Sequence, residues 1–95
     1  MTDDTSRIAV TYVTAPACHL CDRGRHVLAD LAAIYPLDVH EVALTAPEGR
    51  QALADSRAPF PPVLLMDGRL VAYGRLSARH LARAFDRLTA TVTGG

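Results

Sequence analysis

The pattern of apolar and polar positions opens with a run of β-forming residues from Ile8 to about Thr14. Nearly every residue here favours a strand, which predicts one that is buried on both faces, as in the centre of a sheet. From about Cys18 to Tyr35, apolar positions recur instead at helical spacing. These positions are Leu20, Val27, Leu28, Leu31 and Ile34. Pro36 ends this predicted helix.

The segment from Leu37 to about Leu44 is less hydrophobic and contains charged residues, which predicts a strand at the edge of the sheet. The residues that follow, Thr45 to Glu48, match a capping box with Pro47 in the first turn of a helix. We therefore expect a short helix that runs to about Ser56. Its apolar content is low, so it should cover the sheet only thinly.

A hairpin pattern follows a proline-rich loop. Val63 to Met66 predicts a third strand, and Leu70 to Tyr73 predicts the strand that returns beside it. The dipeptide Asp67-Gly68 between them is typical of a type I′ hairpin turn. Gly74 then breaks the returning strand.

Ser77 can cap a final helix that extends to about Leu88. The positions expected to face inward are Leu81, Ala84, Phe85 and Leu88. Arginines spaced four residues apart follow the other side, where we interpret them as a solvated face; they are Arg75, Arg79, Arg83 and Arg87. Residues 1–6 and 89–95 are expected to be loose ends.

The predicted order β-α-β-α-β-β-α indicates an α/β protein with a mixed four-stranded sheet flanked by helices. Its 95 residues suffice for a single domain, 1–95, with an ordered core from about 7 to 88. The formal net charge of +0 gives no support for a nucleic-acid or membrane partner. No apolar run approaches the ~20 residues of a membrane helix, and no leader pattern opens the chain, so we expect a cytoplasmic protein.

The chemistry of the chain is concentrated in Cys18-His19-Leu20-Cys21, at the junction of the first strand and the first helix. Two cysteines at this spacing lie one helical turn apart on the same face, close enough to form a disulfide. Unpaired N–H groups at a helix start favour negative charge, so the pKa of the first thiol should lie below the ~8.5 of a free cysteine. We therefore predict Cys18 as the nucleophile and Cys21 as the thiol that resolves the mixed disulfide.

A CxxC pair can also be half of a zinc site. The chain has only these two cysteines and its four histidines are scattered, so no metal-ligand spacing is present and no metal is expected. His19 lies beside Cys18, where a protonated ring would stabilise a thiolate, but it can equally be a solvated surface residue. The remaining histidines are interpreted as surface or packing residues; they are His26, His40 and His80.

The CxxC is joined by a proline that opens the third strand and a glycine that ends the fourth. The segments Tyr12 to Cys21 and Pro62 to Gly68, followed by Gly74, resemble the glutaredoxin-like branch of the thioredoxin-fold superfamily, and the resemblance extends over nearly the whole chain. It implies a thioredoxin-like fold and a redox role for the cysteines. It also implies that Pro62, or alternatively Pro61, is cis, lies against the cysteines and exposes backbone to a substrate.

Some positions depart from the pattern of that family. Pro61 has no N–H, so one backbone hydrogen bond normally offered to a bound thiol peptide is missing beside Pro62. Ala15 stands where the relatives usually carry a basic residue, and Gly74 is single where glutathione binders have paired glycines and an acid. Arg75 could still meet a substrate carboxylate. We therefore expect weak use of glutathione.

From the resemblance we expect a small thiol–disulfide oxidoreductase that acts as a monomer, with no cofactor beyond its Cys18–Cys21 disulfide. The substrate would be a disulfide in a protein or in a low-molecular-weight thiol. An external thiol or a flavoprotein reductase would be the electron donor and reductase partner. Other classes stay open: an iron–sulfur cluster carrier that uses Cys18, a strictly glutathione-coupled enzyme, and a non-catalytic adaptor with the same fold.

Overall fold

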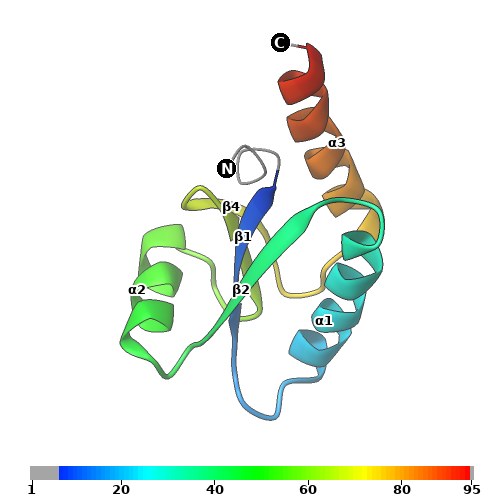
Figure 1. Cartoon of the computed structure of the whole chain (residues 1–95). Coiled ribbons are helices and arrows are strands. Elements are labelled where there is room, and N and C mark those ends of the chain that lie inside the picture. Colours follow the sequence, from blue (N-terminus) through cyan, green and yellow to red (C-terminus); the bar gives the residue numbers. More distant parts are fainter. Residues whose placement is uncertain (1–6, 95) are drawn as a thin grey trace.

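The computed structural model of the chain describes residues 7–94, with side chains described through residue 88 (Figure 1). Its elements in chain order are β1 (Ile8–Thr14), α1 (His19–Ala32), β2 (Leu37–Ala43), α2 (Pro47–Ser56), β3 (Val63–Met66), β4 (Arg69–Tyr73) and α3 (Ala78–Gly94). This is the predicted order of strands and helices. The loose end expected at residues 1–6 lies outside the described residues.

The strands form a four-stranded mixed sheet in the order β2-β1-β3-β4. β1 pairs in parallel with β2 and antiparallel with β3, and β3 pairs antiparallel with β4. The sheet therefore has β1 inside and β2 at an edge, as the hydrophobicity of the two segments predicts. Figure 1 shows α1 and α3 on one face of the sheet and α2 on the other. This α/β topology is the one expected for a thioredoxin-like fold.

The core is divided into two hydrophobic clusters, one on each face of the sheet. The larger cluster joins the sheet to α1 and α3; it consists of Ile8, Val10, Tyr12, Leu28, Leu31, Leu64, Leu76, Leu81 and Phe85. The smaller cluster lies against α2; it consists of Val13, Val42, Ala58, Val63 and Leu65, with Ala52 and Leu53 of α2 half-buried against it. Because α2 contributes so little apolar surface, its face of the sheet is thinly covered, as predicted.

The β3–β4 hairpin closes as its turn residues predict. Asp67 has a φ of 53° and Gly68 a φ of 74°, so both central residues have the positive φ that a type I′ turn requires. At the far end of β4, Gly74 has a φ of 68° and is buried. A Cβ at Gly74 would lie 2.9 Å from a ring carbon of Phe60, so another residue there would have to displace that ring.

The capping box expected at Thr45 to Glu48 is wrong. Ala46 is the N-cap of α2, and no side chain accepts a hydrogen bond from the first turn. Pro47 is the first helical residue because its fixed φ suits that position, which leaves Thr45 one residue too early to cap. The carbonyl of Thr45 instead accepts a hydrogen bond from Arg50 Nη1 at 2.8 Å.

The end of α1 also differs from the prediction, because the helix stops at Ala32 and not near Tyr35. Ile34, expected on the inner face, is 73% exposed. The N–H of Ile34 donates to the Leu31 carbonyl at 2.9 Å, a bond across three residues that tightens the chain after the helix. Tyr35 then packs edge-on against Phe85 of α3, with ring centroids 5.4 Å apart. Tyr35, and not Ile34, therefore makes the inward contact that follows α1.

The last helix begins as predicted, since the N–H of His80 donates to Ser77 Oγ at 3.2 Å. It is longer than predicted, because the backbone stays helical to Gly94 where a loose tail was expected from Thr89. The segment contains threonines of low helix propensity, but no proline or glycine interrupts it before Gly94. Leu88, expected to face inward, is 38% exposed.

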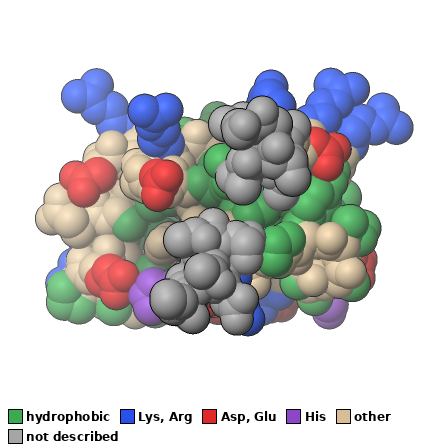
Figure 2. Space-filling model, turned by 45° about the horizontal axis from the view of Figure 1, so that its top comes forward, with side chains coloured by type: hydrophobic (Ala, Val, Ile, Leu, Met, Phe, Trp, Pro, Cys, Tyr) green, Lys and Arg blue, Asp and Glu red, His purple; other side chains and the backbone are tan. Residues whose placement is uncertain are grey.

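The surface carries both signs of charge. Figure 2 shows arginine side chains along one rim, with acidic side chains and apolar surface below them. This mixture agrees with the formal net charge of +0. Within residues 7–94, no helix is both long and apolar enough to cross a membrane.

Helix α1 lies close against the sheet at Gly24. This glycine is buried, and a Cβ on it would overlap the hydroxyl of Tyr12 in β1 and lie 3.1 Å from Leu76 Cδ1. A glycine inside a helix ordinarily lowers helix stability by about 1 kcal/mol relative to alanine. Here the missing side chain lets the helix lie directly on the Tyr12 ring.

We predict that Gly24→Ala lowers the free energy of unfolding by about 1–3 kcal/mol, the usual range for overpacking, although the same change on an exposed helix face stabilises. Urea unfolding of the oxidised protein measures it. The loss should be smaller when Gly24→Ala is made in a Tyr12→Phe background, because the overlapping hydroxyl is gone. A Gly24→Ala protein as stable as the parent would contradict this packing.

Candidate functional site

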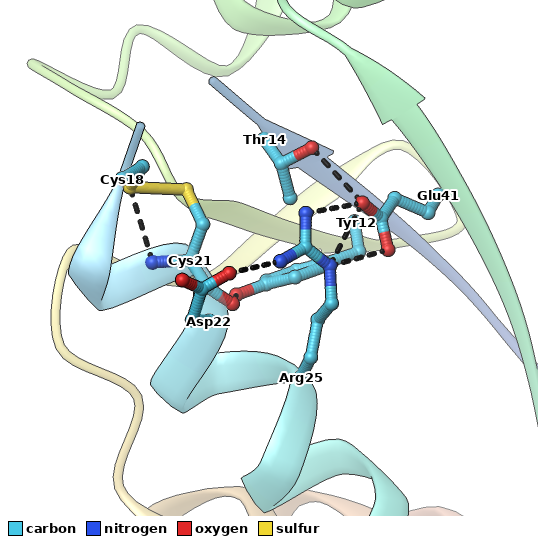
Figure 3. The surroundings of a disulfide bond; sticks show 7 residues. All are labelled: Tyr12, Thr14, Cys18, Cys21, Asp22, Arg25 and Glu41. Atoms are coloured by element: carbon cyan, nitrogen blue, oxygen red, sulfur yellow. Dashed lines mark hydrogen bonds and ion pairs between the residues drawn. A yellow bond between two sulfur atoms is a disulfide. The ribbon is translucent and has the colours of Figure 1, made fainter. Parts of the chain in front are cut away.

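The CxxC cysteines form a disulfide at the start of α1, with their Cα atoms 5.2 Å apart (Figure 3). The chain leaves β1 and turns at Pro16 and Ala17, where Ala17 has a positive φ of 50°. Cys18 is the N-cap of α1 in an extended conformation, and its Sγ accepts a hydrogen bond from the Cys21 N–H at 3.1 Å. The sulfur of Cys18 therefore occupies the place that a serine or aspartate oxygen usually takes at a helix start.

The two sulfur-bearing residues differ in exposure. Cys21 is fully buried, at 0% exposure, whereas Cys18 is only half-buried. Cys21 also belongs to the inner face of α1, which it shares with Gly24 and Leu28. A molecule approaching from solvent therefore meets Cys18 before Cys21.

Tyr12 lies beneath the disulfide, on the sheet side of α1. Its side chain is fully buried, and its hydroxyl donates a hydrogen bond to the Cys21 carbonyl at 2.9 Å. Burial raises the pKa of Tyr12 to about 12, so the hydroxyl remains a protonated donor at neutral pH. The bond joins β1 to the first turn of α1 and fixes the position of Cys21 relative to the sheet.

Beside the disulfide, Arg25 of α1 joins two carboxylates (Figure 3). Its Nη1 lies 2.5 Å from Asp22 Oδ1, and its Nη2 lies 2.7 Å from Glu41 Oε2 on β2. Arg25 Nε donates to both oxygens of Glu41 at 3.0 Å. Thr14 at the end of β1 donates its hydroxyl to Glu41 Oε2 at 3.1 Å. The cluster therefore ties the first turns of α1 to β1 and β2.

These contacts also shape the electrostatics. The Arg25 hydrogen bonds hold the pKa of the Glu41 carboxyl below its ordinary value, and the Thr14 hydroxyl adds to this effect. The Glu41 hydrogen bonds, followed by weaker contributions from Asp22, raise the pKa of Arg25 further above its ordinary value. With one guanidinium between two carboxylates, the cluster keeps an excess of negative charge next to the cysteine turn.

The prolines expected near the site have the predicted backbone form. The Pro61–Pro62 peptide bond is cis, and Pro62 is fully buried. The Pro62 carbonyl accepts a hydrogen bond from the Gly74 N–H at 2.8 Å, so these two predicted substrate-binding residues lie side by side. The expected stacking of Pro62 over Cys18 stays a prediction.

The other candidate residues near the site are on the surface. His19 is the first residue of α1 and is exposed, and Arg75 is exposed in the segment between β4 and α3. His40 pairs with Glu48 across 3.1 Å, and the ring of His80 lies 3.1 Å from the Val71 carbonyl. The interpretation of these last two histidines as surface or packing residues is confirmed. Among the described residues, no three histidine, cysteine or acidic side chains gather in a way that could hold a metal ion.

Sequence reasoning missed the residues that surround the disulfide. Tyr12 is fully buried and its hydroxyl bonds to the cysteine turn, a contact that the strand pattern does not indicate. Asp22 and Arg25 are three residues apart in a helix, a spacing that favours an ion pair and was visible in the sequence. Glu41 could not be placed from the sequence, because it depends on the parallel register that sets it opposite Tyr12.

The chain was compared with protein-family models and with curated proteins, and no match was found. The site itself therefore has to carry the functional interpretation. It is a disulfide at CxxC spacing in a small α/β domain, with one sulfur-bearing residue buried and the other accessible. This arrangement is compatible with redox chemistry.

We predict a pH-dependent contribution of the Arg25–Glu41 pair to stability. Because the folded-state pKa of Glu41 lies below its ordinary value of 4.5, its carboxylate stabilises the folded state above that value. The contribution is lost as the pH falls through the folded-state pKa. Glu41→Gln should therefore lower the free energy of unfolding at pH 7, and the difference from the parent should shrink toward pH 3.

Urea unfolding at a series of pH values measures this difference. Arg25→Gln provides the control, since Glu41→Gln should have little further effect once the guanidinium is gone. Both partners are partly exposed, so we expect a modest effect that weakens in high salt. A Glu41→Gln effect that is constant from pH 7 to pH 3 would contradict the assigned ion pair.

Proposed function

We propose that this protein is a thiol–disulfide oxidoreductase, with Cys18 as the attacking thiol and Cys21 as the resolving thiol. The observation that carries the proposal is the hydrogen bond from the Cys21 N–H to Cys18 Sγ at the N-terminus of α1. After reduction, the same N–H and the helix dipole favour a thiolate at Cys18, so we expect its pKa below the ~8.5 of a free thiol. The full burial of Cys21 supports a second, internal role for that thiol.

In the reductive direction, the Cys18 thiolate attacks one sulfur of a substrate disulfide. A bond forms between Cys18 and that sulfur, the substrate disulfide breaks, and one substrate thiolate leaves. Cys21 then loses its proton and attacks Cys18 Sγ, which releases the second substrate thiol and closes the Cys18–Cys21 disulfide. The substrate gains two electrons and two protons, and the external donor later returns the same number to the protein.

The side chains near Cys21 act as supports in this scheme and not as bases. Tyr12 has a pKa of about 12 and donates to the Cys21 carbonyl, so its hydroxyl holds the turn in place and takes no proton from the thiol. The pKa of Glu41 is lowered by Arg25, which makes its carboxylate a weak proton acceptor. The proton of Cys21 therefore leaves with the departing substrate thiolate or to water.

We further propose that the chain belongs with the glutaredoxin-like proteins but uses a donor other than glutathione. Pro62 and Gly74, joined by a 2.8 Å hydrogen bond, are candidates to border the substrate together with the exposed Arg75. Ala15 offers no cation to a glutathione carboxylate, and the excess negative charge of the Asp22–Arg25–Glu41 cluster opposes an anionic donor. A reducing compartment such as the cytoplasm suits this cycle.

We predict that the single-cysteine variants separate the two thiols. Cys21→Ser should react with a disulfide substrate and stall as a covalent mixed disulfide, whereas Cys18→Ser should form no adduct. Mass spectrometry under non-reducing conditions detects the adducts, and brief iodoacetamide treatment of the reduced parent at about pH 6 should label Cys18 before Cys21. Stable adducts of Cys18→Ser, or preferential labelling of Cys21, would reverse the assignment.

We also predict poor coupling to glutathione. Reduction of a small disulfide should be followed in parallel with glutathione plus its reductase, with mycothiol, and with a thioredoxin-reductase system. Each missing charge-assisted contact is worth about 1.5–3 kcal/mol, so the loss of two should weaken glutathione binding at least a hundredfold. Turnover should be supported better by one of the other donors.

Ala15→Lys serves as the matched variant for this comparison. The added cation should raise the glutathione-coupled rate by about tenfold, the equivalent of one restored contact. The rate with the preferred donor should not change. Fast turnover of the parent protein with millimolar glutathione would contradict the donor prediction. Absence of turnover with every donor, or a coloured iron–sulfur centre in freshly purified protein, would contradict the proposed activity itself.

A further inference from the structure

A groove unrelated to the disulfide lies between α2 and the end of β2. It is an open surface hollow of about 650 Å³, lined by Leu44, Thr45, Arg50, Leu53, Ala54, Arg57 and Ala58. This volume is in the range of small-molecule binding sites. The groove is therefore large enough for a compact organic ligand.

The floor of the groove is apolar and firmly packed. Leu44 and Leu53 are half-buried against the smaller core cluster, to which the buried Ala58 belongs. The backbone at this floor is fixed as well, since the Leu44 N–H donates to the Thr14 carbonyl at 2.6 Å. A ligand lying on this floor would cover apolar surface without a rearrangement of the core.

Charge is distributed unevenly around α2. The acidic and amide side chains occupy one flank of the helix. On this flank Gln51 donates a hydrogen bond to Asp55, and Glu48 pairs with His40 of β2. The opposite flank faces the groove and carries Arg50, then Leu53 and Ala54 about one turn later, and Arg57 at the helix end, two turns from Arg50. Among the described residues that line the groove there are two arginines and no carboxylate.

The two arginines are positioned in different ways. Arg50 is held at the rim, because its Nη1 donates to the Thr45 carbonyl at 2.8 Å while its other N–H groups are left for a ligand. Arg57 follows the helix with a φ of 61°, a left-handed conformation that glycine usually takes at a helix end. Its guanidinium makes no ion pair with any residue in the described range, so its charge is available at the groove.

We propose that this groove binds a small organic carboxylate with an aliphatic body. The carboxylate pairs with the guanidinium of Arg57, whose planar fork matches two carboxylate oxygens, and Arg50 adds positive charge at the other end of the groove. The aliphatic part lies on Leu44 and Leu53, where it is removed from water. The proposal is independent of the redox activity, since none of the lining residues belongs to the cysteine turn.

The test is a titration of the oxidised ¹⁵N-labelled protein with straight-chain carboxylates from butyrate to decanoate, below their micelle concentrations. Backbone amide shifts should concentrate in residues 44–58 and saturate. Affinity should rise by up to about fourfold per added methylene until the groove is full, because each buried methylene contributes about 0.8 kcal/mol. Alcohols of the same length should bind at least tenfold more weakly, because they lack the charge.

Three variants sharpen the test. Arg57→Asn, in which asparagine tolerates the left-handed backbone, should weaken carboxylate binding about tenfold or more, and Arg50→Gln should weaken it by a smaller factor. Arg83→Gln removes the same charge from α3, on the other face of the sheet, and should leave the affinity unchanged. The proposal is overturned if shifts do not saturate, if alcohols bind as well as carboxylates, or if all three variants behave alike.

Discussion

The contact between Tyr12, Gly24 and the Cys21 carbonyl sets the position of the whole cysteine turn. Tyr12 belongs to the central strand, and its buried hydroxyl reaches the first turn of α1 only because Gly24 has no side chain. A polar hydroxyl at this depth needs a partner, and the Cys21 carbonyl is that partner. The helix is thereby held on the sheet at the point where the cysteine pair begins.

The difference between the two cysteines follows from this placement. With Cys21 anchored on the inner face of α1, Cys18 falls at the N-cap, where its sulfur accepts the Cys21 N–H and remains partly accessible. The Arg25–Glu41 bridge adds a second tie between the helix and the sheet. The local geometry thus gives one thiol access to solvent and helix N–H groups, and gives the other a protected position one turn away.

Much of this arrangement could be predicted from the sequence because local patterns determine it. The hydrophobic run at β1, the Asp67-Gly68 turn and the CxxC before a helix each lead directly to their observed structures. The failures come from effects that local patterns do not encode. Helix α2 begins at Pro47, so its N-cap is Ala46 and not the expected Thr45. The partners of Tyr12 and Glu41 depend on tertiary packing and strand register. The site was therefore located from the sequence, but its supporting residues were not.

The most direct test of a redox role is whether the Cys18–Cys21 disulfide opens and closes reversibly in the folded protein. The protein would be equilibrated with mixtures of reduced and oxidised dithiothreitol, quenched with acid, alkylated, and analysed by mass spectrometry, with circular dichroism recorded at both extremes. We expect one two-electron transition between intramolecular forms, identical from either direction, with the fold retained throughout. Unfolding on reduction, or reoxidation mainly to intermolecular dimers, would contradict a redox role for this pair.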